Sequence, residues 1–141
     1  MSATWSTGAT SVLERANEGW PGVWSLLFAA GKAAFRLSLQ LPIGVGAALA
    51  FAAADTCEAR DEVGWEHPDL PMTALAVDLG PLGPQVDLPA ACGVVADLLD
   101  GALDRLCALA ATGRTSDEQQ LAQRLGWRIR EIRRAVVAVH A

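Results

Sequence analysis

The sequence of 141 residues contains no tyrosine, only two histidines and only three cysteines. Cys57, Cys92 and Cys107 are too few and too scattered for a disulfide framework, and an odd number of thiols is typical of a reducing compartment. Free cysteine behaves as a small buried hydrophobic residue in most folds. We therefore predict a cytoplasmic protein with interior thiols.

Motifs of catalysis are also missing. The chain has no Gly-x-Ser-x-Gly, His-Glu-x-x-His or Cys-x-x-Cys sequence and no glycine-rich phosphate loop. Glu58, Glu62 and Glu66 precede His67 and could supply metal ligands if they shared one helix face. Gly64 and the nearby prolines favour a solvated loop instead, so we predict no catalytic residue, no cofactor and no metal site.

Charged residues make up 19% of the chain, below the roughly 25% of an average soluble domain. This shortage predicts that part of the surface is covered by a partner subunit. The charges are also segregated. Residues 55–104 hold eleven acids and one base, whereas residues 105–141 hold seven arginines and three acids. Blocks of opposite sign are expected to pair, within one chain or between two.

Residues 37–54 carry no charge at all. Eighteen such residues reach the lower limit for a transmembrane helix, which makes membrane association one alternative. The run contains Gln40 and Pro42 and is rich in alanine, so a buried core helix is the favoured interpretation.

Helical periodicity dominates the chain and predicts one all-α domain spanning residues 1–141. The expected architecture is a four-helix-type bundle, with a short helix before it and residues 1–10 as a loose N-terminal arm. The main helices are expected at residues 23–41, 43–58, 90–111 and 116–139.

Between the second and third of these helices we expect a long acidic loop. Residues 58–72 are acidic and are interrupted by Gly64, Pro68 and Pro71. Apolar residues then alternate over 75–79 and 86–88, which is typical of a short β-hairpin or of an extended segment.

The C-terminal stretch 116–139 has the clearest helix pattern. A Thr115-x-x-Glu118 capping box opens it, and Asp97, Asp100 and Asp104 on the preceding helix are the expected partners of its arginines. Its apolar residues recur at steps of three and four and form one seam for packing: Ala122, Leu125, Ile129, Ile132, Val136 and Val139.

An alternative breaks this stretch at Gly126. Residues 121–136 then resemble a helix-turn-helix unit, with Ala122 at the crossing of the two helices. This resemblance implies a DNA-binding regulator whose contacts to DNA would be made by Arg128, Arg130, Arg133 and Arg134. The acidic chain and the apolar Ile129 both favour the continuous helix.

Large aromatic residues suggest where a partner could bind. Trp20, Trp24, Phe28 and Phe35 follow helical spacing near the apolar run, and aromatic anchors are frequent at interfaces. The sequence thus predicts a non-enzymatic helical protein that acts through self-association, as a homo-oligomer, or through a protein partner. DNA binding and membrane association remain the two alternatives.

Overall fold

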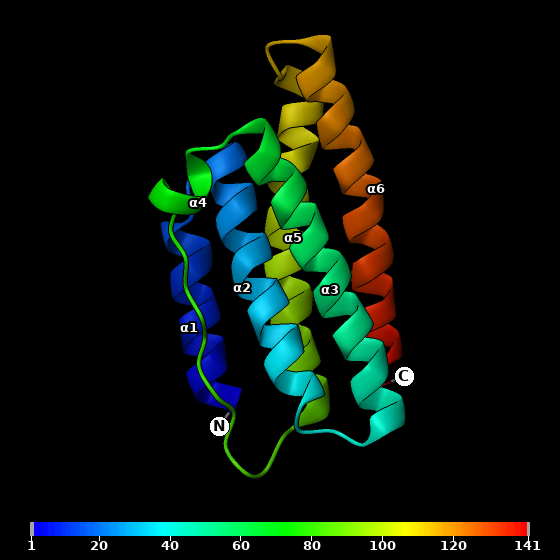
Figure 1. Cartoon of the computed structure of the whole chain (residues 1–141). Helices are drawn as coiled ribbons and strands as arrows, with labels where there is room; N and C mark the ends of the chain where they lie inside the picture. Colours follow the sequence, from blue (N-terminus) through cyan, green and yellow to red (C-terminus); the bar gives the residue numbers. More distant parts are fainter. Residues whose placement is uncertain (1, 141) are drawn as a thin grey trace.

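A computed structural model describes the backbone of residues 2–140 and the side chains of residues 5–140. It confirms the all-α class, since every regular element of this part of the chain is a helix (Figure 1). The helices are α1 (Ser2–Arg15), α2 (Trp20–Ser38), α3 (Ile43–Glu66), α4 (Leu70–Thr73), α5 (Leu88–Thr112) and α6 (Ser116–Ala138).

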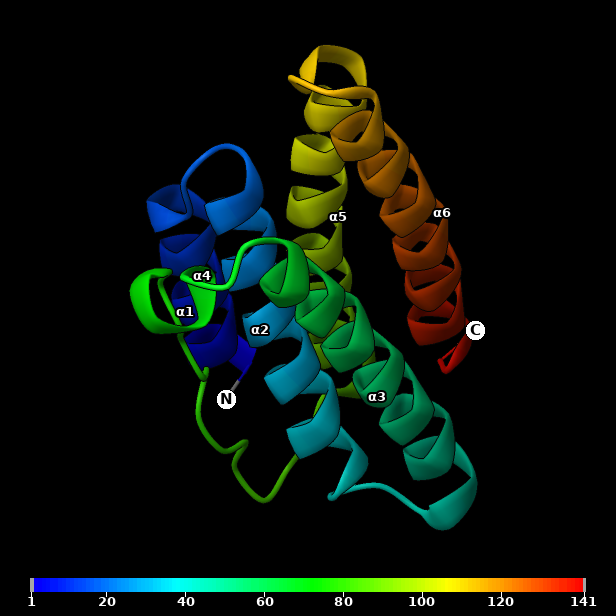
Figure 2. The ribbon, with the colours of Figure 1, turned by 45° about the horizontal axis from the view of Figure 1, so that its top comes forward.

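Two helical hairpins form the centre of the molecule. The first consists of α2 and α3 and the second of α5 and α6. The hairpins pack through α2 against α5 and through α3 against α6, while α1 lies against α5 and α2 (Figure 2). This arrangement buries α2 on nearly every side.

Two glycines allow α1, α2 and α5 to approach closely. A Cβ atom on Gly22 would lie 1.6 Å from the carbonyl oxygen of Asn17, and one on Gly101 would lie 2.6 Å from Leu13 Cδ2. The guanidinium of Arg105 fits into this region and donates hydrogen bonds to the carbonyls of Ala16, Asn17 and Gly101 at 3.0, 2.8 and 2.9 Å. The bonds to Ala16 and Asn17 satisfy carbonyls just beyond the end of α1, where a helix leaves its last carbonyls without partners.

The N-terminal segment differs from its prediction. Residues 2–10, expected as a loose arm, belong to α1, because Trp5, Ala9 and Val12 share one face and are buried. The spacing of these three residues by four and three explains why the segment is helical. Pro21 lies in the first turn of α2, where its missing N–H costs no hydrogen bond.

The prediction of an acidic loop at 58–72 is also largely wrong, because α3 continues to Glu66. Glu58 and Glu62 lie one turn apart and meet Arg124 and Arg128 of α6. The Arg128 guanidinium lies 3.3 Å from Glu58 and 3.1 Å from Glu62, and the Arg124 guanidinium lies 2.9 Å from Glu62. Carboxylates with partners on a neighbouring helix offset the modest helix propensity lost at Gly64.

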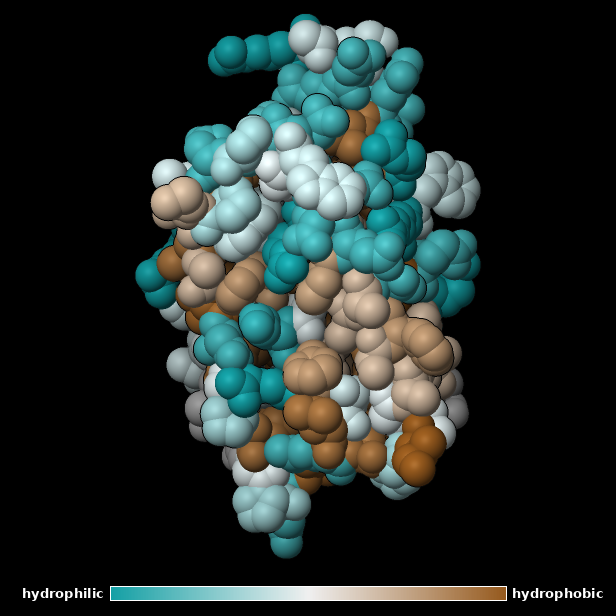
Figure 3. Space-filling model, in the orientation of Figure 1, coloured by the Kyte–Doolittle hydropathy of each residue, from teal (hydrophilic) through white to brown (hydrophobic). Residues whose placement is uncertain are grey.

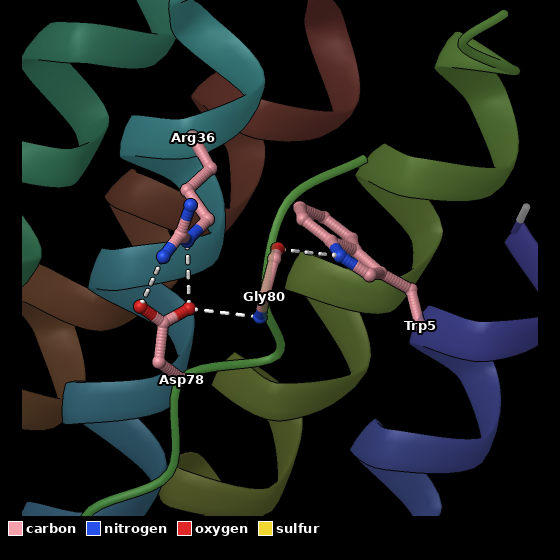
Figure 4. A network of polar contacts seen from close by, with 4 residues as sticks. All are labelled: Trp5, Arg36, Asp78 and Gly80. Atoms are coloured by element: carbon pink, nitrogen blue, oxygen red, sulfur yellow. Dashed lines mark hydrogen bonds and ion pairs between the residues drawn. The ribbon is translucent and has the colours of Figure 1, made fainter. Parts of the chain in front are cut away.

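No strand occurs among residues 2–140, so the hairpin alternative is not supported and residues 74–87 form an extended crossover. The crossover runs beside α1 in both ribbon views and connects the two helical hairpins (Figures 1 and 2). Polar contacts hold it in place. The Asp78 carboxylate pairs with Arg36 at 2.7 Å, and the Trp5 indole N–H donates to the Gly80 carbonyl at 3.1 Å (Figure 4). The Gln40 amide also donates to the Leu82 carbonyl at 3.1 Å.

Helix α6 is continuous through Gly126. The Thr115 hydroxyl accepts the Glu118 N–H at 3.1 Å, as the predicted capping box requires, although the Glu118 carboxylate bonds to the N–H of Arg114 rather than that of Thr115. The predicted seam is buried from Ala122 to Val136, and Val139 is partly buried against the same core.

We expect Gly22→Ala to lower the free energy of unfolding by about 1–3 kcal/mol, because its methyl group would overlap a backbone carbonyl that cannot move alone. Gly93 is the matched control, since a Cβ there meets nothing within 4 Å. Gly93→Ala should raise the unfolding free energy by up to about 1 kcal/mol through helix propensity. Urea unfolding followed by circular dichroism measures both, and equal effects of the two variants would contradict the close approach at Gly22.

A second prediction concerns the crossover. The hydrogen bonds from Arg36 lower the pKa of the Asp78 carboxyl, with further help from the N–H of Gly80. Since the folded pKa lies below the unfolded value of about 3.9, the stabilisation is complete above that pH and is lost as the pH falls through the folded pKa. Asp78→Asn should therefore lower the urea midpoint at pH 7, and its difference from the wild type should shrink as the pH falls through the folded pKa of Asp78. Asp97→Asn, at an exposed site with no ion pair among the described residues, should leave the midpoint unchanged at each pH.

Candidate interaction surface

The four aromatic residues predicted to bind a partner lie in different environments. Trp20 and Trp24 are only 6% and 5% exposed, and Phe28 is half-buried. Phe28 stacks on Trp24 at 5.3 Å and carries Lys32 and Arg60 over its ring at 5.6 and 5.8 Å. Only Phe35, at 51% exposed, presents its ring to a partner.

The four arginines of the DNA-binding alternative have partners within the chain. Arg128 pairs with α3, Arg133 lies 2.6 Å from Asp100, and Arg134 lies 2.6 Å from Glu131 on its own helix. Arg130 donates a weak bond to the Cys107 sulfur at 3.8 Å. Asp100 is therefore the one member of the predicted aspartate series with an ion pair among the described residues. The continuous α6 also removes the turn that a helix-turn-helix requires.

A polar pocket of about 410 Å³ opens where the end of α3 meets the start of α6. The Trp20 indole donates to the Glu118 carboxylate at 2.8 Å, and the His67 ring lies 5.3 Å from the Trp20 ring. The hydrogen bond from Trp20 is the main cause that lowers the pKa of Glu118, supported by the N–H of Arg114. The hydrogen bond between Trp20 and Glu118 thus connects α2 to the start of α6. Within residues 2–140, no three His, Cys, Asp or Glu residues are arranged to hold a metal ion.

Four of the seven large apolar side chains that are exposed among the described residues lie toward the turn of the α2–α3 hairpin, whereas Trp65, Met72 and Trp127 lie elsewhere. Phe35 lies in the last turn of α2, Leu39 directly follows α2, and Ile43 and Phe51 belong to α3, with exposed fractions of 51%, 69%, 91% and 72%. Exposed Ala47 and Ala54 lie between and beside them. We call these six residues the α2–α3 apolar face. Figure 3 shows brown and beige surface over the corresponding half of the molecule, below a mostly teal half.

The sequence of α3 explains why this face is exposed. Residues 43, 47, 51 and 54 recur at steps of four, four and three, which places them on one side of the helix. The opposite side, with Leu49, Ala52 and Ala53, packs into the core. The first half of α3 is therefore apolar all round, and the outward side becomes charged only from Asp55 onward.

Sequence reasoning assigned residues 37–54 to a buried helix and so missed Leu39, Ile43 and Phe51. One signal in the sequence could have revealed them. Residues 43–54 contain no polar stripe, so this part of the helix must expose apolar residues wherever no neighbouring helix covers it. The structure divides the uncharged run between α2, a turn at 39–42 and α3. None of the described helices combines the length and the apolar character that crossing a bilayer demands.

We expect Trp20→Phe to raise the pKa of Glu118 toward its ordinary value, because the variant cannot donate the indole hydrogen bond. The Glu118 carboxyl carbon, followed by NMR across the acid range, measures this shift. Trp65→Phe is the control, since Trp65 is exposed and belongs to a different pocket. An unchanged Glu118 pKa in Trp20→Phe would contradict the assigned cause.

Comparison with known proteins supplies no further information on this surface. No protein-family model matches the chain, and neither a curated protein nor a solved structure matches it. The α2–α3 apolar face and the polar pocket are therefore the features of the molecule that bear on its function.

Proposed function

We propose that this chain is a non-enzymatic interaction protein that binds a protein surface through the α2–α3 apolar face. The supporting observation is the exposure of Leu39, Ile43 and Phe51 side by side with Phe35 on one end of a hairpin. Single exposed apolar residues are ordinary, but a contiguous patch of them marks an interaction site. The proposal includes self-association as a homo-oligomer and binding to a different protein.

The area of the face agrees with an association of moderate strength. Its four large side chains expose on the order of 500 Å², which matches the largest patch found on a typical monomer. At roughly 25 cal/mol per Å², covering this area contributes on the order of 12 kcal/mol before the costs of association. Those costs are about 4–15 kcal/mol, so stable binding needs the neighbouring alanines to be covered as well.

The other parts of the chain support binding rather than catalysis. In the polar pocket, Trp20 and Glu118 form a hydrogen bond that links two helices. Arginines of α6 pair with acidic residues of the same chain. A cytoplasmic location stays a prediction from the cysteine content. The expectation of interior thiols is correct for Cys92, whereas Cys57 is partly buried and Cys107 is exposed.

Phe51→Glu tests the proposal. We expect the wild-type chain either to exceed the monomer mass in light scattering or, as a monomer, to enhance the fluorescence of a hydrophobic dye. Phe51→Glu should weaken whichever property is observed at least tenfold, because an interface charge costs several kcal/mol to desolvate. The same change at Trp127, which is 66% exposed on α6, should leave the property unaltered. A wild-type monomer that binds no dye would refute the proposal.

A further inference from the structure

The composition of the α2–α3 apolar face indicates which protein binds to it. We infer that it binds a second copy of this chain, with the α3 helices of the two copies antiparallel and crossing at Ala47. This inference rests on the proposed function, because it requires that the α2–α3 apolar face be the binding surface. It adds the identity of the partner and the geometry of the contact.

Charge is the first argument for a second copy. On a surface that binds itself through a twofold axis, a charge near the axis meets its own copy and a charge away from the axis needs an opposite charge facing it, and an uncharged surface avoids both requirements. No residue from 37 to 54 is charged, and Arg36 at the border is already paired with Asp78. The chain as a whole has a net charge of −5. This face is therefore a surface where two such chains can meet without burying an unpaired charge.

The order of residues along α3 decides the relative direction of the two helices. In a parallel pair, Asp55, Glu58 and Asp61 would each face the same acid of the partner. In an antiparallel pair centred on Ala47, the two Asp55 residues lie eight positions from the centre on opposite sides. At 1.5 Å per residue they are about 24 Å apart, which is well beyond the screening length of about 8 Å at physiological salt.

Side-chain size is the second argument for the antiparallel crossing. Ala47 and the exposed Gly44 and Ala48 are small, so two α3 helices can approach to about 8 Å between their axes. A twofold axis at Ala47 then pairs position 51 with position 43 of the other copy. The ring of Phe51 would pack on Ile43 twice, once on each side of the axis. Both side chains are largely exposed in the single chain, at 72% and 91%.

The area agrees with a dimer of standard size. The large side chains of the face, together with the small residues between them, approach the roughly 800 Å² that each partner of a stable complex covers. Phe35 in the last turn of α2 and Leu39 directly after it extend the contact beyond α3.

Cysteine cross-linking tests the geometry on the full chain. The two thiols that reach the surface are first removed by Cys57→Ser and Cys107→Ser, leaving the buried Cys92. Ala47→Cys is then compared with Trp65→Cys. Positions 47 and 65 are five helical turns apart and lie on the same line of α3, and both are exposed.

Under mild oxidation we expect Ala47→Cys to form a covalent dimer in more than half of the chains and Trp65→Cys to form almost none. In the antiparallel pair the two positions 65 are about 54 Å apart, whereas the two positions 47 lie at the axis. Light scattering should show that both proteins have dimer mass before oxidation, and circular dichroism should show unchanged helix content.

Three outcomes would overturn the inference: a monomer, a dimer that cross-links at position 65, and a dimer that cross-links at neither position. A monomer that still binds a hydrophobic dye would show that the partner is not a second copy. The proposal that the α2–α3 apolar face binds a protein would then stand. A monomer that binds no dye overturns both. Ile43→Gln, at the most exposed position of the face, gives an independent check, since it should weaken dimerisation at least tenfold without affecting the fold.

Discussion

Helix α2 is in contact with α1, α3, α4 and α5, and packing against α2 determines where these helices lie. Small residues make this possible, because alanines at positions 29, 30, 33 and 34 let neighbouring backbones approach from several directions. Leu26, Leu27 and Leu37 fill the larger gaps and are fully buried. Helix α6 packs mainly on α5 and α3 and meets α2 through the Trp20–Glu118 hydrogen bond, and the first half of α3 is left with one open side.

Much of the architecture could be predicted from local signals. The boundaries of α5 and α6 were close to correct because Asp87, Gly113 and Thr115 act at the helix ends. Local signals failed where distant residues decide the structure. Residues 58–66 are helical because Ala59 and Val63 are buried in the core, and arginines some sixty positions later pair with Glu58 and Glu62 on the outer side. Residues 75–79 stay extended because they lie along α1 and α2.

The interaction surface could be predicted only in part. Composition correctly indicated an apolar segment at 37–54, but burial depends on how many helices surround it, and the sequence does not specify that number. The aromatic residues show the same limit. Trp24 and Phe35 are eleven residues apart and therefore lie within about 20° of each other around α2. Trp24 is nevertheless buried and Phe35 is exposed, because other segments of the chain cover the helix near Trp24 and leave it open near Phe35.

The absence of tyrosine has an optical consequence. The aromatic absorption of this chain near 280 nm comes from tryptophan alone, and its five indoles occupy distinct positions. Trp5 is bonded to the crossover and Trp20 to the start of α6, whereas Trp65 and Trp127 are largely exposed. The buried indoles therefore serve as native fluorophores for two separate junctions of the fold. Single-tryptophan variants would follow the crossover and the α2–α6 junction independently, with no label attached.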